Sequence, residues 1–360
     1  MRFAIFGDHV DGWRMADVLR ASGRHHVVAG TAAPSVAEAD WSDLRIVGDP
    51  EELLADPGIE AVIVAGPPSR RLELLRRVLQ SERPALCVHP VDSRPDGAYE
   101  IQMLQGDTHQ VVLPILPEAY ASNIAEMRSA FEPHCVLELE WHGIETPSFD
   151  ERAAESRPAF PLWTLLRRIG GEIVEFAVFA NHEALESGDP AVGFGKFQDG
   201  RLFQALWLAR QPRRTATISI RGRSDGPVVT WSDGSPECWR QMVERFETAV
   251  ARLRDAPRVT PGSGPAVDLR DGLGWQDEIR ALELNDLARR SIERRRAYTL
   301  DFQEATEEVG FKGTMTLIGC ALLWLAPVLL ILSAWAPWLG WMIAPVLVAF
   351  LALQLLKGKG

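Results

Sequence analysis

The chain has 360 residues, of which 46% are apolar, and a formal net charge of -11. This length is enough for two domains and a further segment. The acidic balance argues against a nucleic-acid partner, because phosphate binding needs clustered positive charge. The four cysteines are widely spaced and form no C-x-x-C pair, so we expect neither a metal site nor disulfides, and a reducing compartment.

The first predicted element is an apolar strand at 3–6, which ends in the turn G-D-H-V-D-G at 7–12. In the dinucleotide-binding turn G-x-G-x-x-G, the second glycine lets the backbone approach the pyrophosphate. Gly7 and Gly12 keep the first and third positions, and His9 replaces the second glycine. His9 therefore either donates a hydrogen bond to a phosphate or fills the pocket so that no dinucleotide binds. The two aspartates of the turn favour the second alternative, because they would repel a pyrophosphate.

Alternating strands and helices follow this turn. We predict strands at 26–30, 61–65, 85–88 and 111–113, and helices at 12–21, 51–55, 70–80 and 97–104. Short apolar strands separated by helical patterns are typical of a parallel sheet with right-handed crossovers. Residues 1–118 are therefore predicted to form a Rossmann-like, doubly wound α/β domain.

Beyond this domain the pattern indicates a mixed or antiparallel sheet. Strands are predicted at 134–141, 192–197, 202–208 and 215–221, with a D-G turn at 199–200, and helices at 235–254 and 274–294. We expect residues 119–300 to form a second α/β domain, with 257–265 as a surface crossover.

The C-terminal segment at 313–356 contains no charged residue. It is long enough for two membrane spans of about 20 residues each, and its central tryptophans, prolines and glycine suit an interfacial turn. We therefore predict a transmembrane helical hairpin after a linker at 301–312. A pair of buried core helices is the alternative, although such helices usually show a polar face. Lysines flank both ends of the hairpin, so the positive-inside rule places residues 1–312 on the cytoplasmic side of the membrane.

Four stretches carry motifs whose order is informative. They are EELLADPGIEAVIVAGPP at 51–68, LCVHP at 86–90, Gly170-Gly171, and a D-G pair at 271–272 before the last long helix. In order and spacing they resemble the "eLLadpdvDaVvvatP", "V-E-K-P", "G-G-x-L-x-D-x-G-x-H" and C-terminal "D-G" segments of the Gfo/Idh/MocA oxidoreductases. The resemblance covers roughly residues 1–300.

The resemblance implies an oxidoreductase that uses NAD or NADP and acts on a sugar-like small molecule, such as an inositol or related polyol. It also implies a homo-oligomer. The family transfers hydride with the help of the lysine of E-K-P and an Asp/His pair after the double glycine, which supply a cation and a proton acceptor. His89 stands in place of the lysine, and Glu175 and Phe179 stand in place of the pair. His182, on nearly the same helical face as Phe179, is a possible substitute, so the catalytic candidates are His89, Glu175 and His182.

The same resemblance gives the cofactor-binding candidates, which follow the ends of the predicted strands. They are Gly7, His9, Gly12, Thr31, Gly66, Pro67, Arg71 and Pro90. Thr31 offers only a hydroxyl where a carboxylate for a ribose 2′-hydroxyl is expected. Arg71 either binds a phosphate or another anion, or belongs to a solvated basic helix face with Arg70, Arg76 and Arg77.

Two functions remain open from the sequence. Because the cofactor and catalytic motifs depart from those of the family, the sequence favours a membrane-anchored, degenerate member, a pseudoenzyme that binds a ligand or acts as a scaffold. The alternative is an active NAD(P)-dependent dehydrogenase or reductase of a sugar, inositol or related polyol, which uses His89 and either Glu175 or His182.

Overall fold

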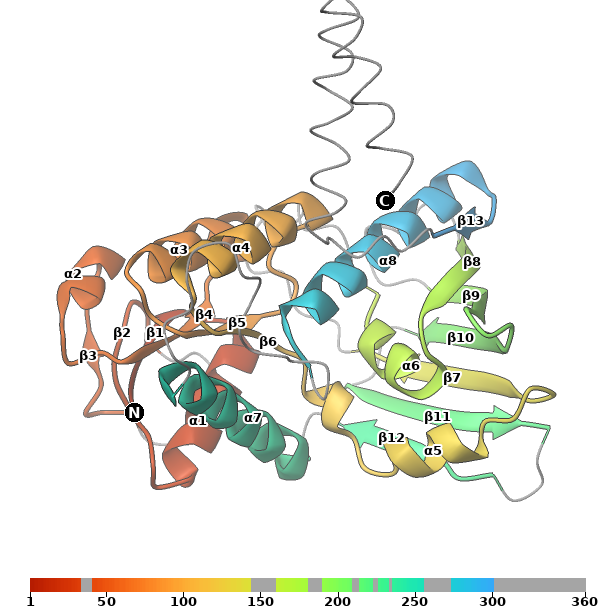
Figure 1. The fold of residues 1–360 in the computed structure, drawn as a ribbon, viewed down its shortest axis with the longest axis horizontal. Helices are drawn as coiled ribbons and strands as arrows, with labels where there is room; N and C mark the ends of the chain where they lie inside the picture. Colours follow the sequence, from red (N-terminus) through yellow and green to blue (C-terminus); the bar gives the residue numbers. More distant parts are fainter. Residues whose placement is uncertain are drawn as a thin grey trace, which may run out of the picture. The chain divides into compact units, whose positions relative to one another are not determined.

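The described part of the computed structural model contains two β-sheets with helices packed on them (Figure 1). It comprises residues 1–33, 41–143, 160–180, 190–208, 214–222, 226–232, 235–255 and 273–300, all within one unit, Met1–Leu300. The predicted crossover at 257–265, the D-G pair at 271–272, the linker at 301–312 and the hairpin at 313–356 lie outside these residues. Within them, no helix is both long and apolar enough to cross a membrane.

The first sheet is parallel, with strand order β3-β2-β1-β4-β5-β6. Its strands are β1 (Arg2–Gly7), β2 (His26–Gly30), β3 (Arg45–Ile46), β4 (Ala61–Ala65), β5 (Ala85–Val88) and β6 (Val112–Ile115). The central strands β4 and β5 are buried along their whole length, as expected for a parallel sheet covered on both faces. The predicted Rossmann-like sheet is confirmed, and only the two-residue β3 was not predicted.

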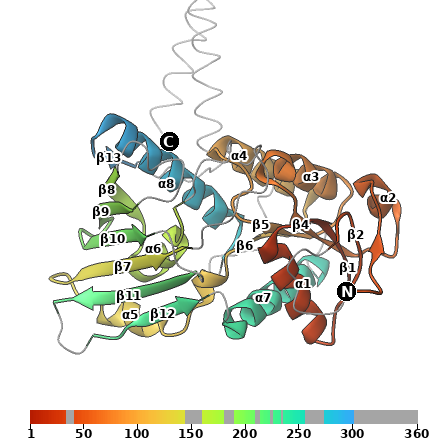
Figure 2. The same cartoon turned by 180° about the vertical axis from the view of Figure 1, so that it is seen from behind.

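Helices cover both faces of this sheet. They are α1 (Val10–Ala21), α2 (Pro50–Ala55), α3 (Pro68–Gln80) and α4 (Pro95–Thr108). Figure 2 shows α1 on one side of the sheet and α3 and α4 on the other. The apolar face of α3 explains its position, because Leu74, Leu75, Val78 and Leu79 are buried against the sheet while the charged residues between them are mostly exposed or half-buried.

The core of the first sheet also contains a helix from the second half of the chain, α7 (Pro236–Asp255). Its Trp239 and Phe246 are buried in one cluster with Phe3 and Trp13. The predicted division between residues 118 and 119 stays a prediction, but α7 crosses it to complete the first core.

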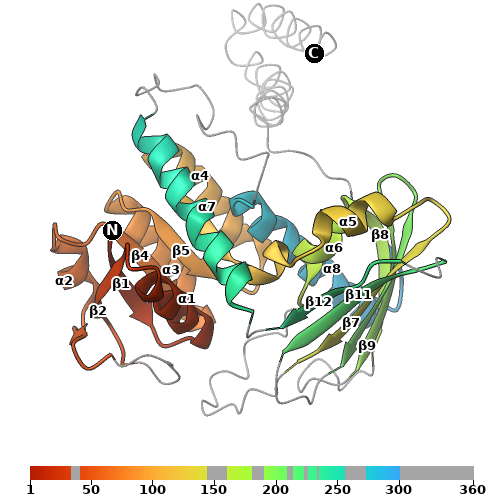
Figure 3. The same cartoon turned by 90° about the horizontal axis from the view of Figure 1, so that it is seen from below.

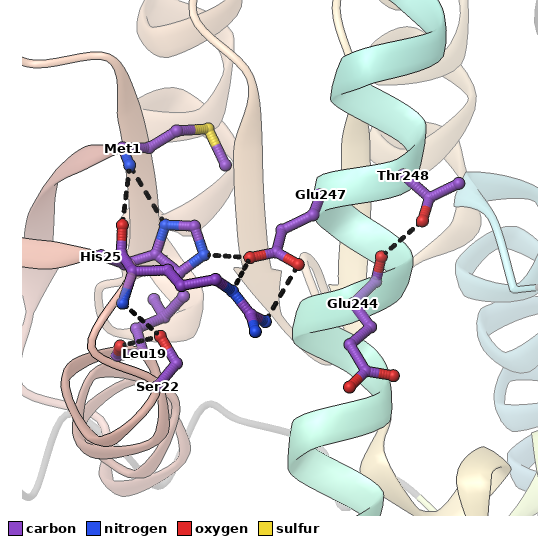
Figure 4. A network of polar contacts seen from close by, with 8 residues as sticks. Met1, Leu19, Ser22, His25, Glu244, Glu247 and Thr248 are labelled. Atoms are coloured by element: carbon purple, nitrogen blue, oxygen red, sulfur yellow. Dashed lines mark hydrogen bonds and ion pairs between the residues drawn. The ribbon is translucent and has the colours of Figure 1, made fainter.

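Polar contacts hold α7 against the first sheet (Figure 4). Glu247 accepts hydrogen bonds from Arg24 Nε at 2.9 Å and from Arg24 Nη2 at 3.1 Å, and it lies 2.6 Å from His25 Nε2. The amino group of Met1 lies 3.2 Å from the other ring nitrogen of His25. These contacts fix the turn before β2 to the middle of α7.

The second sheet has the order β12-β11-β7-β10-β9-β8-β13 and is mixed, because β7 and β10 are parallel and the other pairs antiparallel. Its strands are β7 (Val136–His142), β8 (Ile173–Ala180), β9 (Ala191–Phe197), β10 (Leu202–Leu208), β11 (Thr215–Arg221), β12 (Val229–Ser232) and β13 (Tyr298–Thr299). Figure 3 shows helices α5 (Ile124–Ala130) and α6 (Trp163–Gly170) on one face. The helix α8 (Trp275–Arg294) packs on β8 and also on α4, so it joins the two cores. The predicted mixed sheet is confirmed.

One local prediction is wrong: Phe179, which was placed on a helical face with His182, lies in the strand β8, and the double glycine before it ends the helix α6. Gly171 follows α6 with a φ of +94°, a conformation that favours glycine, and β8 starts two residues later. Ile173, Phe176 and Val178 point into the core, with a register shift near the start of the strand. Alternating burial of apolar residues is the period of a strand, and it overrides the helical assignment that the family motif implied.

Candidate functional site

The candidate site lies where the carboxyl ends of β1, β4, β5 and β6 meet along one edge of the first sheet. In open parallel sheets, ligands bind in the crevice outside these ends. The loops that follow the four strands contain residues 7–9, 66–67, 89–94 and the 3₁₀ helix η1 (Pro117–Tyr120). Most of the residues singled out in the sequence fall in these loops.

Gly7 and Gly12 fit the turn roles that the sequence suggested. Gly7 has a φ of +112°, and a Cβ there would lie 2.2 Å from the carbonyl oxygen of Ala65. A Cβ on Gly12 would lie 2.3 Å from the Ala65 Cβ, so only glycine lets α1 pack this closely on β4. The turn is therefore as tight as a dinucleotide-binding turn requires.

His9 caps the N-terminus of α1. Its Nδ1 accepts a hydrogen bond from the backbone N–H of Asp11 at 3.2 Å. Burial lowers the pKa of His9 to about 4, and the neighbouring charges of Arg71 and Arg214 act in the same direction. The imidazole is therefore neutral near pH 7, and because Nδ1 is the acceptor, the proton resides on Nε2.

Backbone N–H groups of this turn are already engaged within the protein. Gly7 donates to Thr31 Oγ1 at 2.9 Å, and His9 donates to the carbonyl of Ala65 at 3.1 Å. The Asp11 N–H is bound by the His9 ring, as described above. The Thr31 hydroxyl, which the sequence suggested as a contact to a ribose, thus accepts a hydrogen bond that stabilises the turn.

The carboxylate of Asp11 is paired with an arginine from the second sheet. Asp11 is 9% exposed, and Arg214, which immediately precedes β11, binds both of its oxygens, with Nη1 at 3.1 Å from Oδ2. Arg14 lies 3.5 Å away. Burial alone raises the pKa of Asp11, but Arg214 lowers it below its ordinary value. The repulsion of a pyrophosphate that we expected from Asp11 is therefore offset by two arginines.

Arg71 is not part of a solvated helix face, and that alternative is wrong for this residue. Its side chain is 1% exposed, and Nε donates to the carbonyl of Gly66 at 3.0 Å while Nη1 donates to the carbonyl of Pro90. Arg71 thereby ties the loop after β4 to the loop after β5. Its Nη2 is buried and makes no hydrogen bond within the described part of the chain. A buried donor without a partner is unfavourable, so a ligand oxygen here would be stabilising.

His89 follows β5 and is clamped by Glu278 of α8. Its Nδ1 lies 2.6 Å from Glu278 Oε2, and the other carboxylate oxygen accepts from the N–H of Val91 at 2.7 Å. Burial alone lowers the pKa of His89, but the Glu278 carboxylate, itself 1% exposed, raises it above the ordinary value. His89 is therefore protonated at higher pH than a free histidine. The sequence placed Glu278 in a predicted helix but contained no signal that connects it to His89.

Glu118 is the second acidic residue that the sequence analysis missed. It lies in η1, directly after β6, and is 9% exposed. Burial raises the pKa of Glu118 to about 7, while the charges of His89 and Arg214 partly oppose this shift. The sequence signal that could have identified Glu118 is a carboxyl side chain that closely follows a predicted strand of the parallel sheet.

The structure thus gathers His9, Asp11, Arg71, His89 and Glu118 around one edge. The carboxylate of Glu175 is not among them, because it lies on the exposed face of β8, as does Phe179, which is 57% exposed. His182 lies outside the described residues. Across the described ranges, no group of three or more His, Cys, Asp or Glu side chains is arranged as metal ligands.

Comparisons with known proteins agree with the fold. No protein-family model matches the chain. Among curated proteins, the inositol 2-dehydrogenase of Mycolicibacterium smegmatis is 35% identical over 57 residues, so the match spans 16% of this chain and 16% of that relative.

Solved structures are similar over most of the chain. They include a myo-inositol dehydrogenase from Corynebacterium glutamicum, with a TM-score of 0.62 and 18% identity over 84% of this chain and 99% of that one. The WlbA dehydrogenase from Bordetella pertussis, solved with NADH and UDP-GlcNAcA, has a TM-score of 0.63 and 14% identity over 84% and 99%. These structure neighbours are Gfo/Idh/MocA-type oxidoreductases with an NAD-binding Rossmann fold, and at these identities the likeness establishes the fold.

Proposed function

We propose that this chain is an active oxidoreductase of the Gfo/Idh/MocA type, which uses NAD or NADP to interconvert a hydroxyl and a carbonyl group on a sugar-like polyol. One observation carries the proposal: His89, clamped by Glu278 at 2.6 Å, lies with Glu118 at the carboxyl edge of the parallel sheet. The solved relatives named above support inositols as the first substrates to test, and UDP-linked acidic sugars as the second.

The residues of the edge fit a nicotinamide dinucleotide. The unpartnered Arg71 Nη2 is a donor for a ligand oxygen, the neutral His9 offers Nε2–H, and the charge of Asp11 is balanced by Arg214. Residues that would line the cofactor are Gly7, His9, Gly12, Gly66, Pro67, Arg71 and Pro90. When bound, the nicotinamide ring would accept or supply the hydride.

The proton chemistry falls to His89 and Glu118. Oxidation of a secondary alcohol releases a proton from the hydroxyl and a hydride from the carbon that carries it. Protonated His89 stabilises negative charge on the substrate oxygen by hydrogen bonding through Nε2, since Glu278 holds Nδ1. Glu118, whose pKa is about 7, accepts the proton, because a base works best when its pKa lies near the working pH. Reduction runs these transfers in reverse.

These contacts favour an active enzyme over a degenerate scaffold. The histidine in place of the family's lysine has a raised pKa because of Glu278, and the turn with His9 keeps its tight geometry. Phe179, which the family motif aligned with a catalytic histidine, belongs to a strand away from the gathered residues, so it does not argue against catalysis.

Membrane attachment and self-association complete the proposal. The uncharged segment at 313–356 supports a hairpin anchor, with residues 1–312 on the cytoplasmic side. Phe179, Phe194 and Leu202 are about half-exposed on the outward face of the second sheet, which supports a homo-oligomer.

Binding and turnover of the full-length chain in detergent test the proposal. We expect NADH or NADPH to bind with a Kd in the range of about 1 µM to 1 mM, and NAD(P)⁺ to be reduced with myo-inositol or another member of a polyol panel. His89→Gln should abolish turnover while preserving binding, and His89→Lys, which restores the family's residue, should retain turnover. Absence of nucleotide binding at millimolar concentration would leave the scaffold interpretation in its place.

A further inference from the structure

The turn between β1 and α1 has lost many of the donors that a glycine-rich turn offers to phosphate. In such turns the backbone N–H groups at the helix N-terminus point at the ligand. Here the N–H groups of Gly7, His9 and Asp11 are bound by Thr31, Ala65 and the His9 ring. An anion at this turn must therefore obtain much of its hydrogen bonding from side chains.

Arg214 brings a cation to this turn from a different sheet. It immediately precedes β11, and its guanidinium binds both carboxylate oxygens of Asp11 in the first turn of α1. Its charge also lowers the pKa of His9 and opposes the rise in the pKa of Glu118. Arg214 thus lies at the turn, and its charge acts on both His9 and Glu118.

Arg71 provides a second, independent indication that this edge of the first sheet binds a ligand. Its guanidinium is 1% exposed, and Nη2 has no hydrogen-bond partner within the described residues. The charge of Asp11 acts on the pKa of Arg71, so the two groups interact electrostatically. A hydrogen bond to a ligand oxygen would satisfy a buried donor of this kind.

We propose that Arg214 is a phosphate-binding residue contributed by the second sheet, which together with the Nε2–H of His9 replaces the backbone donors of the glycine turn. This inference rests on the proposed function for the identity of the ligand, the diphosphate of a nicotinamide dinucleotide. A planar guanidinium binds phosphate oxygens in pairs, and Asp11 holds it in position over the helix N-terminus. Cofactor binding in this chain therefore depends on the second sheet as well as on the first.

Binding measurements on variants of Arg214 test this inference. The full-length chain is titrated with NADH, followed by its fluorescence, and with ADP-ribose, which has the diphosphate but no nicotinamide, followed by calorimetry. Arg214→Gln should weaken binding of both by tenfold or more, and Arg214→Lys should fall between it and the wild type. Arg221→Gln is the matched control, because Arg221 lies at the other end of β11 and is 73% exposed. Thermal unfolding of each variant checks that the fold is intact.

Asp11→Asn separates phosphate binding from a purely structural ion pair. Asparagine keeps one side-chain oxygen that can accept from Arg214 and so hold it in position, while it takes a negative charge away from the turn, so both ligands should bind as tightly as in the wild type or more tightly. Equal weakening by Asp11→Asn and Arg214→Gln, or no effect of Arg214→Gln, would overturn the inference and leave the proposed function intact. A wild-type chain that binds neither ligand would overturn both. If binding depends on Arg214 but no hydride is transferred, only the proposed oxidoreductase activity is overturned.

Discussion

His9 and His89 stand at two corners of the same sheet edge, and the fold shifts their pKa values in opposite directions. His9 accepts a hydrogen bond from a backbone N–H at 3.2 Å and is surrounded by arginines, so burial lowers its pKa to about 4. His89 has the carboxylate of Glu278 at 2.6 Å, and this charge overcomes burial and raises its pKa. The surroundings of each ring, burial and two arginines at His9 and a carboxylate at His89, set the direction of each pKa shift.

The opposite pKa shifts suit His9 and His89 to different roles. At His9, a neutral ring can donate a hydrogen bond to an anion while Arg214 supplies the positive charge. At His89, a raised pKa favours a charged donor, which suits an oxygen on which negative charge develops. Both residues stand where the family that the sequence resembles has other residues, and each is held by a hydrogen bond to a neighbouring group. The following experiments break one corner at a time, beginning with the largest expected effect.

Glu278→Gln should have the largest effect, because it removes the charge that keeps His89 protonated. Burial then dominates, and the pKa of His89 should fall below its ordinary value. Breaking a buried ion pair typically lowers the free energy of unfolding by about 3 kcal/mol or more. Histidine NMR titration and chemical denaturation measure the two changes. Glu293→Gln is the control, on the same helix but half-exposed, and an unchanged His89 pKa in Glu278→Gln would contradict the comparison.

Glu118→Gln should make the protein more stable at alkaline pH. The folded-state pKa of Glu118 is raised from 4.5 to about 7, so the folded protein binds an additional proton between these values and loses stability as pH rises through them. The amide removes this penalty, and the gain at pH 8 should be at most about 3 kcal/mol, with little gain at pH 4. Denaturation at both pH values measures it. A variant stabilised equally at pH 4 and pH 8 would show that the pKa of Glu118 is not raised toward 7. If Glu118 is the proton acceptor, the variant should also lose turnover.

The elements of the first sheet were predictable because each depends on local pattern. The run AVIVA at 61–65 is apolar throughout, which is the pattern of a parallel strand that is buried on both faces. The strand at 173–180 was missed because a family motif was given more weight than the alternating pattern of Ile173, Phe176 and Val178. Site residues in loops after strands, such as His89 and Pro67, could be found because the ends of those strands could be predicted.

Partners that arrive from distant parts of the chain were not predictable. Glu278 is 189 residues from His89, and Arg214 is 203 residues from Asp11. No single-sequence pattern connects such positions, since the contacts arise only when α8 and the residue before β11 come next to the loops of the first sheet in the folded chain. The identity of the site residues could be inferred, but their charge states could not, because charge depends on these partners.

His9→Asn tests the neutral corner and should have a moderate effect. Asparagine also caps helices well, so the cap is kept while the titrating group is removed. Because the folded-state pKa of His9 is lowered, its contribution to stability is present above pH 6.5 and is lost as pH falls toward 4. The wild type should therefore lose more stability than His9→Asn over this window, by about 1 kcal/mol once the partial exposure of the ring is taken into account. Parallel acid-denaturation curves for the two proteins would contradict a neutral His9.

Arg24→Gln should have the smallest effect, and it tests whether a carboxylate at short distance is sufficient to charge a histidine. His25 lies 2.6 Å from Glu247, the same separation as between His89 and Glu278, yet its pKa is lowered. Burial is the main cause, and the Met1 ammonium and Arg24, which shares Glu247, add to it. Removing Arg24 leaves Glu247 to His25 alone, so the pKa of His25 should rise, with a change in stability of at most about 1 kcal/mol. Histidine NMR titration measures the shift, with Arg20→Gln, whose arginine pairs with Asp43, as the control. If the pKa of His25 stays unchanged, sharing of Glu247 with Arg24 is not the cause of its low pKa, and a carboxylate 2.6 Å from the ring is not sufficient to raise the pKa of a buried histidine.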